Sequence, residues 1–331
     1  MRFLRFFLIL VLLCGAVAAG GGYVWFTRPL PLAETVEFRV LPGMGLRDAA
    51  QTLNQAGVAI EPNLLVLAAR LSGQARGIRA GTYGIAPGTT PQTLLAMLTA
   101  GKVLQVDAQL IEGWTFRQWR AKLAGHSGLE HVTDTLSEAE LMTRLGLPGQ
   151  RPEGMFFPDT YRVDKYSSDL ALFALAARTM QKHLQREWAR REANLPYRNA
   201  YEALIMASIV EKETGIASDR ALVAGVFVNR LRIGMRLQTD PTVIYGLGER
   251  FDGNLRKVDL LTDTPYNTYT RAGLPPTPIT MPGLASLKAA LHPAATRALY
   301  FVARGDGSSH FSATLEEHNQ AVNRYQRRGR S

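Results

Sequence analysis

Cysteine is almost absent from this sequence. The single cysteine among 331 residues is Cys14, which excludes an intramolecular disulfide and any cysteine-rich zinc module. The six histidines form no HExxH pattern, and neither a GxxxxGKS/T loop nor a GxGxxG loop occurs. The usual zinc-protease and nucleotide-binding motifs are therefore missing. We expect neither a metal site nor a cofactor.

Charged residues are missing from one long stretch near the start of the chain. None occurs from Phe6 to Phe26, and as a helix these residues would span about 30 Å, the thickness of a hydrocarbon layer. Arg2 and Arg5 precede the run, so the positive-inside rule places the N-terminus in the cytoplasm and the rest of the chain across the membrane. A cleaved signal peptide, with a weak site at Ala16–Ala18, is the alternative.

Acidic residues are outnumbered by basic ones. The chain has 38 Lys and Arg against 28 Asp and Glu, a net charge of +10. Because an exported domain does not meet nucleic acid, we expect no nucleic-acid partner. An anionic lipid surface or wall polymer suits the basic excess better, and a solvated basic surface is the alternative.

Residues 35–103 read as a small α+β module. The alternation in Val36–Val40 predicts a strand, apolar residues at helical spacing predict helices near 46–53 and over Leu64–Leu71, and Gly81–Ile85 predicts a second strand. By pattern this β-α-α-β unit resembles a LysM-like module, which would bind glycans that contain N-acetylglucosamine. A plain structural module without a ligand is the alternative.

The fold class expected is α+β. Its four parts are residues 1–28, the cytoplasmic start and transmembrane helix; 35–103, the LysM-like unit; 104–165, a connecting α+β region; and 166–331, a mainly helical domain with a few strands. In the last part, an amphipathic helix is expected from Asp169 to Ala193 and another helix over Tyr201–Thr214. The second helix is apolar on all sides, which predicts that it is buried.

Two acidic residues end that buried helix. Burial disfavours the charged form of a carboxyl group, so the pKa of Glu211 or Glu213 should rise. A carboxylic acid that is still protonated near neutral pH can act as a general acid in glycosidic bond cleavage. Both glutamates could instead cap the helix end or pair with Lys212. Periodicity does not choose between them, since both stripes of the helix are apolar.

Several longer runs carry a family resemblance. They are ASIVEKET (207–214), FVNRLRIGMRLQTDPTVIYG (227–246), TPYNTY (264–269), GLPP (273–276) and the EGMFFPDTY loop (153–161). Together they resemble the MltG (YceG-like) endolytic murein transglycosylases over the chain from the anchor to the final helix. The resemblance implies an inner-membrane anchor, a catalytic domain in the periplasm and cleavage of nascent peptidoglycan strands. It also places the catalytic glutamate on Glu213 rather than Glu211.

An analogy at the level of the fold points to supporting residues. Glu213-Thr214, Leu237-Gln238 and Tyr266-Asn267 are similar to segments of lysozyme-like transglycosylases. We therefore expect substrate contacts from Gln238, Tyr266, Asn267 and Tyr269, and supporting roles for Glu211, Thr214 and Asp240. Ordinary loop packing is the alternative for the four substrate contacts, capping of a turn for Asp240, and surface pairing with Lys212 for Glu211.

The expected function is endolytic cleavage of the bond between N-acetylmuramic acid and N-acetylglucosamine, leaving a 1,6-anhydro end and terminating glycan elongation. The resemblance also implies work beside peptidoglycan synthases such as class A penicillin-binding proteins. A non-catalytic scaffold that binds peptidoglycan and a hydrolytic muramidase are the alternatives.

Overall fold

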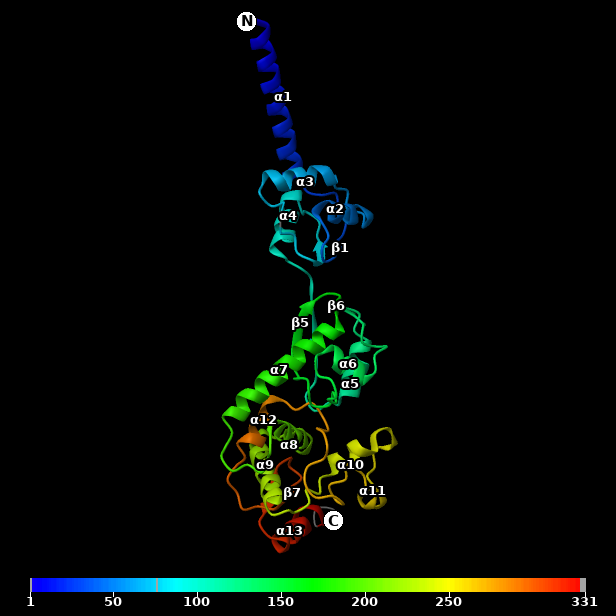
Figure 1. The fold of residues 1–331 in the computed structure, drawn as a ribbon, viewed down its shortest axis with the longest axis vertical. Helices are drawn as coiled ribbons and strands as arrows, with labels where there is room; N and C mark the ends of the chain where they lie inside the picture. Colours follow the sequence, from blue (N-terminus) through cyan, green and yellow to red (C-terminus); the bar gives the residue numbers. More distant parts are fainter. Residues whose placement is uncertain (1, 76, 328–331) are drawn as a thin grey trace. The chain divides into compact units, whose positions relative to one another are not determined.

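A computed structural model describes residues 2–75 and 77–327, which form two compact units (Figure 1). The first unit comprises Met1–Asp107 and Arg162–Ser167, and the second comprises Ala108–Tyr161 and Ser168–Ser331. The residues expected as a connecting region, 104–165, are divided between the two. Helices dominate and short two-stranded sheets accompany them, so the fold is mixed α+β.

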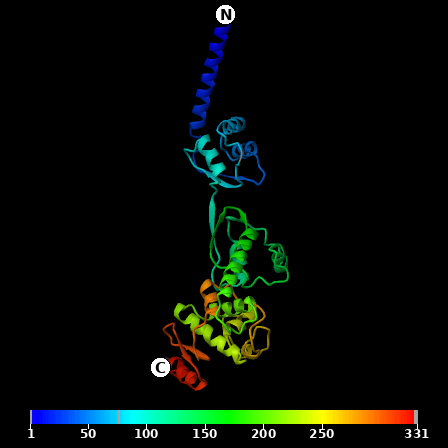
Figure 2. The same ribbon diagram turned by 60° about the vertical axis from the view of Figure 1, so that its left-hand side comes forward.

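The first element, α1 (Arg2–Thr27), is one continuous helix of 26 residues (Figure 2). It is the single helix in the described residues that is long and apolar enough to cross a membrane. Its side chains are exposed along most of its length, and Cys14 is among them. At its end Trp25 and Phe26 pack against the core of the first unit, so that unit folds directly onto the end of α1.

The first unit has the expected β-α-α-β order. Its elements are β1 (Val36–Val40), α2 (Leu46–Gln55), α3 (Pro62–Leu71) and β2 (Gly81–Ile85), followed by α4 (Pro91–Ala100). The strands pair antiparallel with Phe38 opposite Tyr83, and the two rings stack with centroids 5.7 Å apart. Leu53 and Leu65 from the helices are fully buried against this sheet.

The chain enters the second unit through paired strands. Strand β3 (Gln105–Gln109) pairs with β5 (Thr160–Asp164), and β4 (Leu129–Glu130) pairs with β6 (Ser167–Ser168). Two short helices, α5 (Phe116–Ala124) and α6 (Glu138–Arg144), lie between them in sequence and start with capping boxes at Thr115 and Ser137.

The rest of the second unit is built around helix α8 (Ala200–Glu213), which packs against α7, α9, α10 and α12. Every residue from Ala203 to Val210 is buried, as the apolar sequence predicts. The neighbouring elements are α7 (Asp169–Ala189), α9 (Ala217–Arg232), α10 (Asp240–Leu247), the 3₁₀ turn Gly248–Arg250, α11 (Lys257–Leu261), α12 (Leu284–Leu291), β7 (Tyr300–Ala303), β8 (Ser309–Ser312), α13 (Leu315–Val322) and the π-helical turn Asn323–Arg327.

Helix α7 ends four residues before the expected end at Ala193. The amide of Glu192 donates to the carbonyl oxygen of Leu291 at 3.0 Å, and Asn194 adopts a positive φ of 62°. A contact with α12 therefore takes the chain out of the helix, which a periodic pattern cannot reveal.

Candidate active site

Glu213 opens into a cavity of about 630 Å³ in the second unit. The cavity is walled by residues from the end of α8, from α9, from the loop that leads into α10, and from β7 and α13. A volume of this size falls in the range of small-molecule sites. Its polar lining residues include Arg230, Gln238, Asp240 and Tyr269.

The Glu213 carboxyl group is mostly withdrawn from solvent. Burial raises its pKa above the usual range, and the negative charge of Asp240 adds to the rise. A hydrogen bond from the hydroxyl of Thr239 to Oε1 of Glu213 and the positive charge of Arg230 act in the opposite direction. Because burial is the largest cause, the pKa of Glu213 lies above its usual value, which is the direction that a general acid requires.

Arg230 is a cation that the sequence analysis did not assign to the site. Its side chain is buried, and it donates to the carbonyl oxygens of Leu299 (2.6 Å) and Leu237 (2.6 Å). Its guanidinium lies 5.3 Å from the centre of the Tyr300 ring. Arg230 therefore ties α9 to the wall of the cavity. In the sequence, Asn229 and Arg230 lie within a helix of mixed polarity, and no pattern there predicts that Arg230 lines a cavity.

Thr239 is the second residue that the sequence analysis missed. Its side chain is buried, and its amide donates to Oγ1 of Thr268 at 3.1 Å. The hydroxyl of Thr242 bonds to the carbonyl oxygen of Thr239 and to the Thr268 hydroxyl, both at 2.8 Å. This threonine cluster fixes the hydroxyl that reaches Glu213. The one sequence feature that could have pointed to Thr239 is its place in the LQTDP run (237–241).

Gln238, Asp240 and Tyr269 all line the Glu213 cavity. Gln238 has a positive φ of 50°, and its amide donates to the carbonyl oxygen of Thr268 at 3.1 Å. That bond holds its backbone while the side chain stays exposed. The hydroxyl of Tyr269 donates to Oδ1 of Asp240 at 2.5 Å, which links two sides of the cavity. Three of the residues expected in the site, Gln238, Asp240 and Tyr269, therefore line one cavity together with Glu213.

Asn267 and Tyr266 lie outside the lining of this cavity. Asn267 is fully buried, and its side-chain amide donates to three carbonyl oxygens at the end of α11. Its Oδ1 accepts from the amide of Tyr269 at 2.9 Å, so Asn267 orients a residue that does line the cavity. The Tyr266 hydroxyl shares a hydrogen bond with Thr277, and its ring faces a second cavity of the same unit.

Glu211 and Thr214 flank Glu213 without lining its cavity. Oε2 of Glu211 accepts from the amide of Gly283 at 3.0 Å, at the start of α12. Thr214 is buried, and its hydroxyl accepts from the amide of Ile216 at 3.0 Å. The structure thus directs Glu213, and not Glu211, into the cavity.

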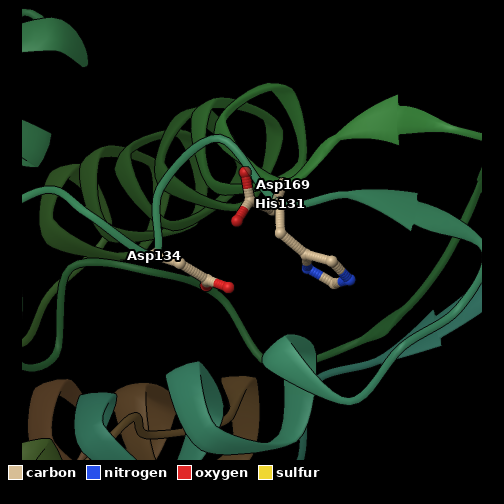
Figure 3. A group of neighbouring side chains, drawn as sticks. All are labelled: His131, Asp134 and Asp169. Carbon is tan, nitrogen blue, oxygen red and sulfur yellow. The ribbon is translucent and has the colours of Figure 1, made fainter.

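A separate group of possible ligands lies at the start of α7, where His131, Asp134 and Asp169 come together (Figure 3). Asp169 is buried, and its carboxylate accepts from the amides of Val132 (3.0 Å) and Thr133 (3.2 Å). It also accepts from the Thr133 hydroxyl. Asp169 therefore clamps this loop onto α7. We assign no metal to the group, because these donors already occupy the carboxylate.

Comparison with known proteins places the chain in a family. The model of the YceG-like family matches residues 38–324. An endolytic murein transglycosylase of Bacillus subtilis is 31% identical over 92% of this chain and 90% of its own length. One of Streptococcus pneumoniae is 25% identical over 96% of this chain, which spans 64% of that relative.

A solved structure has the same fold. The crystal structure of a YceG-like protein from Listeria monocytogenes superposes with a TM-score of 0.55 and 28% identity, covering 87% of this chain and 99% of that one. The family model covers most of the chain, and the cavity with the buried Glu213 lies within the matched residues. The chain therefore belongs to the YceG-like family.

Proposed function

We propose that this protein is an endolytic lytic transglycosylase of peptidoglycan and that Glu213 is its catalytic residue. The observation that carries the proposal is the position of the Glu213 carboxyl group in a cavity of suitable size, where burial raises its pKa. The relatives in Bacillus subtilis and Streptococcus pneumoniae, both named endolytic murein transglycosylases, support the reaction class.

The proposed reaction uses one carboxyl group twice. Glu213 first donates its proton to the oxygen between N-acetylmuramic acid and N-acetylglucosamine, and the C1–O bond breaks. The substrate's own 2-acetamido group stabilises the positive charge at C1. The Glu213 carboxylate then removes the proton of the muramyl C6 hydroxyl, and that oxygen bonds to C1. The product is a 1,6-anhydro end, and no water is consumed.

The lining residues have matching roles. Gln238 and Tyr269 contact the sugar amides and hydroxyls, and Asp240 supports them through its bond to Tyr269. Thr239 and Arg230 set the protonation of Glu213. Asn267 positions Tyr269. This arrangement, with a Glu-Thr pair at the end of a helix and a Gln loop opposite, supports the analogy with lysozyme-like transglycosylases.

Mass spectrometry of the products tests the reaction. Purified peptidoglycan is incubated with the full chain in detergent. We expect products that end in 1,6-anhydro-N-acetylmuramic acid and that come from cuts within the glycan strands. Cuts within a strand are the mark of endolytic cleavage. A hydrolytic muramidase would give products heavier by one water, and a non-catalytic scaffold would give no new ends. Either result would overturn the proposal.

The membrane helix supports a location for this activity. We propose that α1 anchors the protein in the inner membrane with the N-terminus in the cytoplasm and both folded units in the periplasm, because Arg2 and Arg5 precede the apolar run. In that location the enzyme would meet nascent strands from peptidoglycan synthases such as class A penicillin-binding proteins. Protease added to spheroplasts should digest both units, and protection of either unit would contradict this orientation.

The first unit has a proposed role as well. We propose that residues 35–103 form a LysM-like glycan-binding module, that 104–165 connect it to the catalytic domain, and that the catalytic domain covers 166–331. The β-α-α-β order supports this assignment. Retention of the E213Q full chain on insoluble peptidoglycan, compared with the same chain carrying surface substitutions in this module, tests the binding role.

A further inference from the structure

A second cavity of about 740 Å³ lies in the second unit, and the proposed reaction does not use it. It is lined by residues at the start of α5, by the loop 151–153, by Lys212 of α8, by α10 and by Tyr266. Glu153 of the EGMFFPDTY motif is among these residues, so the cavity contains part of a motif without an assigned role.

The floor of this cavity is rigid. Glu153 is buried, and its Oε1 accepts from the amide of Phe116 at 3.1 Å, at the first residue of α5. Glu153 also accepts a hydrogen bond from the hydroxyl of Tyr245. The rings of Tyr245 and Tyr266 meet edge to face, with centroids 4.9 Å apart. Glu153 thus joins α5, α10 and the loop between α6 and β5 into one surface with an aromatic wall.

The rim of the cavity carries more positive than negative charge. Arg117, Arg151 and Lys212 are exposed there, and Glu138 is the exposed acid among the lining residues. Arg117 is paired with Glu249 at 2.5 Å. In the described part of the chain, no ion pair joins Arg151 or Lys212 to a carboxylate. Lys212 donates to the carbonyl oxygen of Gly113 at 3.4 Å, so both cations lack a carboxylate partner among the described residues and can pair with a ligand that carries carboxylates.

The position of the cavity relative to Glu213 identifies that ligand. Glu213 lines the first cavity, and Lys212, which directly precedes it, lines the second. In the same way Asp240 lines the first cavity and Pro241, the next residue, lines the second. Adjacent Cα atoms are about 3.8 Å apart, so both cavities border the place where α8 ends and α10 begins. A substrate that crosses this border would fill both cavities at once. In peptidoglycan the group that branches from the muramyl sugar is a short peptide with free carboxylates.

We propose that the second cavity binds the peptide stem of the muramyl residue at the cleavage site, with Arg151 and Lys212 pairing to its carboxylates. This inference rests on the proposed function. Arginine can hold a carboxylate by two parallel hydrogen bonds, and the aromatic wall receives the apolar parts of the peptide. The enzyme then distinguishes strands that carry stems from strands that have lost them.

The test compares three substrates with the full chain in detergent. One is strands with intact stems, one is the same strands stripped of stems by an amidase, and one carries stems whose carboxylates are converted to amides. We expect kcat/KM to be about tenfold higher or more for intact stems than for the other two, mainly through KM, since hydrogen bonds to charged groups are the strong ones.

Charge-removing variants locate the effect. The double variant R151Q/K212Q should lose the preference for intact stems. The matched control R178Q/K182Q removes the same charges from an exposed part of α7 and should keep it. Equal cleavage of intact and stripped strands by the wild type, or a preserved preference in R151Q/K212Q, would overturn the inference. Equal cleavage of intact and amidated stems would overturn the pairing to carboxylates.

A binding measurement separates this inference from the proposed function. A soluble muramyl tripeptide is titrated calorimetrically into E213Q protein with and without R151Q/K212Q. We expect binding that weakens about tenfold or more in the combined variant. If the wild type cleaves none of the three substrates, the proposed function fails, while the titration still decides whether the stem site exists. If strands are cut but the tripeptide does not bind, only the stem site is wrong.

Discussion

The hydroxyl of Thr239 donates a hydrogen bond to Oε1 of Glu213 from the loop that leads into α10. A bond of this kind stabilises the ionised carboxylate, so it opposes the rise in pKa that burial imposes. The acid strength of Glu213 therefore depends on a balance between its apolar helix and one threonine.

Removal of that hydroxyl should shift the pH profile. In Thr239→Val the pKa of Glu213 rises further, because the bond that favours ionisation is gone. Since the general acid must be protonated, activity falls as pH rises through this pKa, and we expect the falling limb of kcat/KM to move to higher pH. Thr239→Ser keeps the hydroxyl and should retain the original limb. An unchanged profile in Thr239→Val would contradict this coupling.

The two glutamates at the end of α8 should differ in their effect on turnover. Glu213→Gln removes the proposed general acid, and we expect a loss of at least about 10²-fold in the rate at which anhydromuropeptides form. Glu211→Gln changes a residue that bonds to the amide of Gly283 outside the cavity, so it should lose far less. The opposite order of losses would place the catalytic acid on Glu211.

Glu153 should make stability depend on pH. Burial raises its pKa from 4.5 to about 7 in the folded protein. Between these values the folded protein keeps a proton that the unfolded chain has lost. The contribution of Glu153 is therefore full below pH 4.5 and is lost as pH rises to 7, a change on the order of 3 kcal/mol.

The variant Glu153→Gln isolates this contribution. Its amide oxygen still accepts from Phe116, but it does not titrate. Urea unfolding of the wild type and the variant at pH 5 and pH 8 should show that the wild type loses more stability between the two pH values. Parallel changes in both proteins would show that Glu153 titrates normally.

Asn267 should matter for stability before it matters for the substrate. Asn267→Ala leaves three carbonyl oxygens at the end of α11, those of Asp259, Leu260 and Thr262, without this donor, and we expect a loss of about 3 kcal/mol. Asn254→Ala, an exposed asparagine of the same region, should change stability by less than about 0.5 kcal/mol. If Asn267→Ala keeps its stability and only raises KM, Asn267 contacts the substrate instead.

Much of the fold could be read from local patterns. The apolar run that became α1, the β-α-α-β order of the first unit and the buried helix α8 each follow from spacing and hydrophobicity. The early end of α7 could not be read in this way, because it depends on a hydrogen bond between Glu192 and Leu291, which are far apart in sequence.

The candidate site was predictable only in part, for the same reason. Helical periodicity could not choose between Glu211 and Glu213, and the family resemblance did so. The positions of Tyr266 and Asn267, adjacent in sequence, show the limit: Tyr266 lines the second cavity, whereas Asn267 is buried and bonds to backbone atoms. Arg230 was missed because its partners are backbone carbonyl oxygens, which no side-chain pattern reveals.

The bond between Tyr269 and Asp240 has a consequence for the cell wall. Asp240 is the other carboxylate in the described lining of the cavity, and its Oδ1 is already engaged at 2.5 Å. In the proposed reaction the positive charge at C1 is stabilised by the acetamido group that the sugar itself carries. Strands from which a bacterium has removed these acetyl groups would resist the enzyme, so deacetylation would mark where the wall is left uncut.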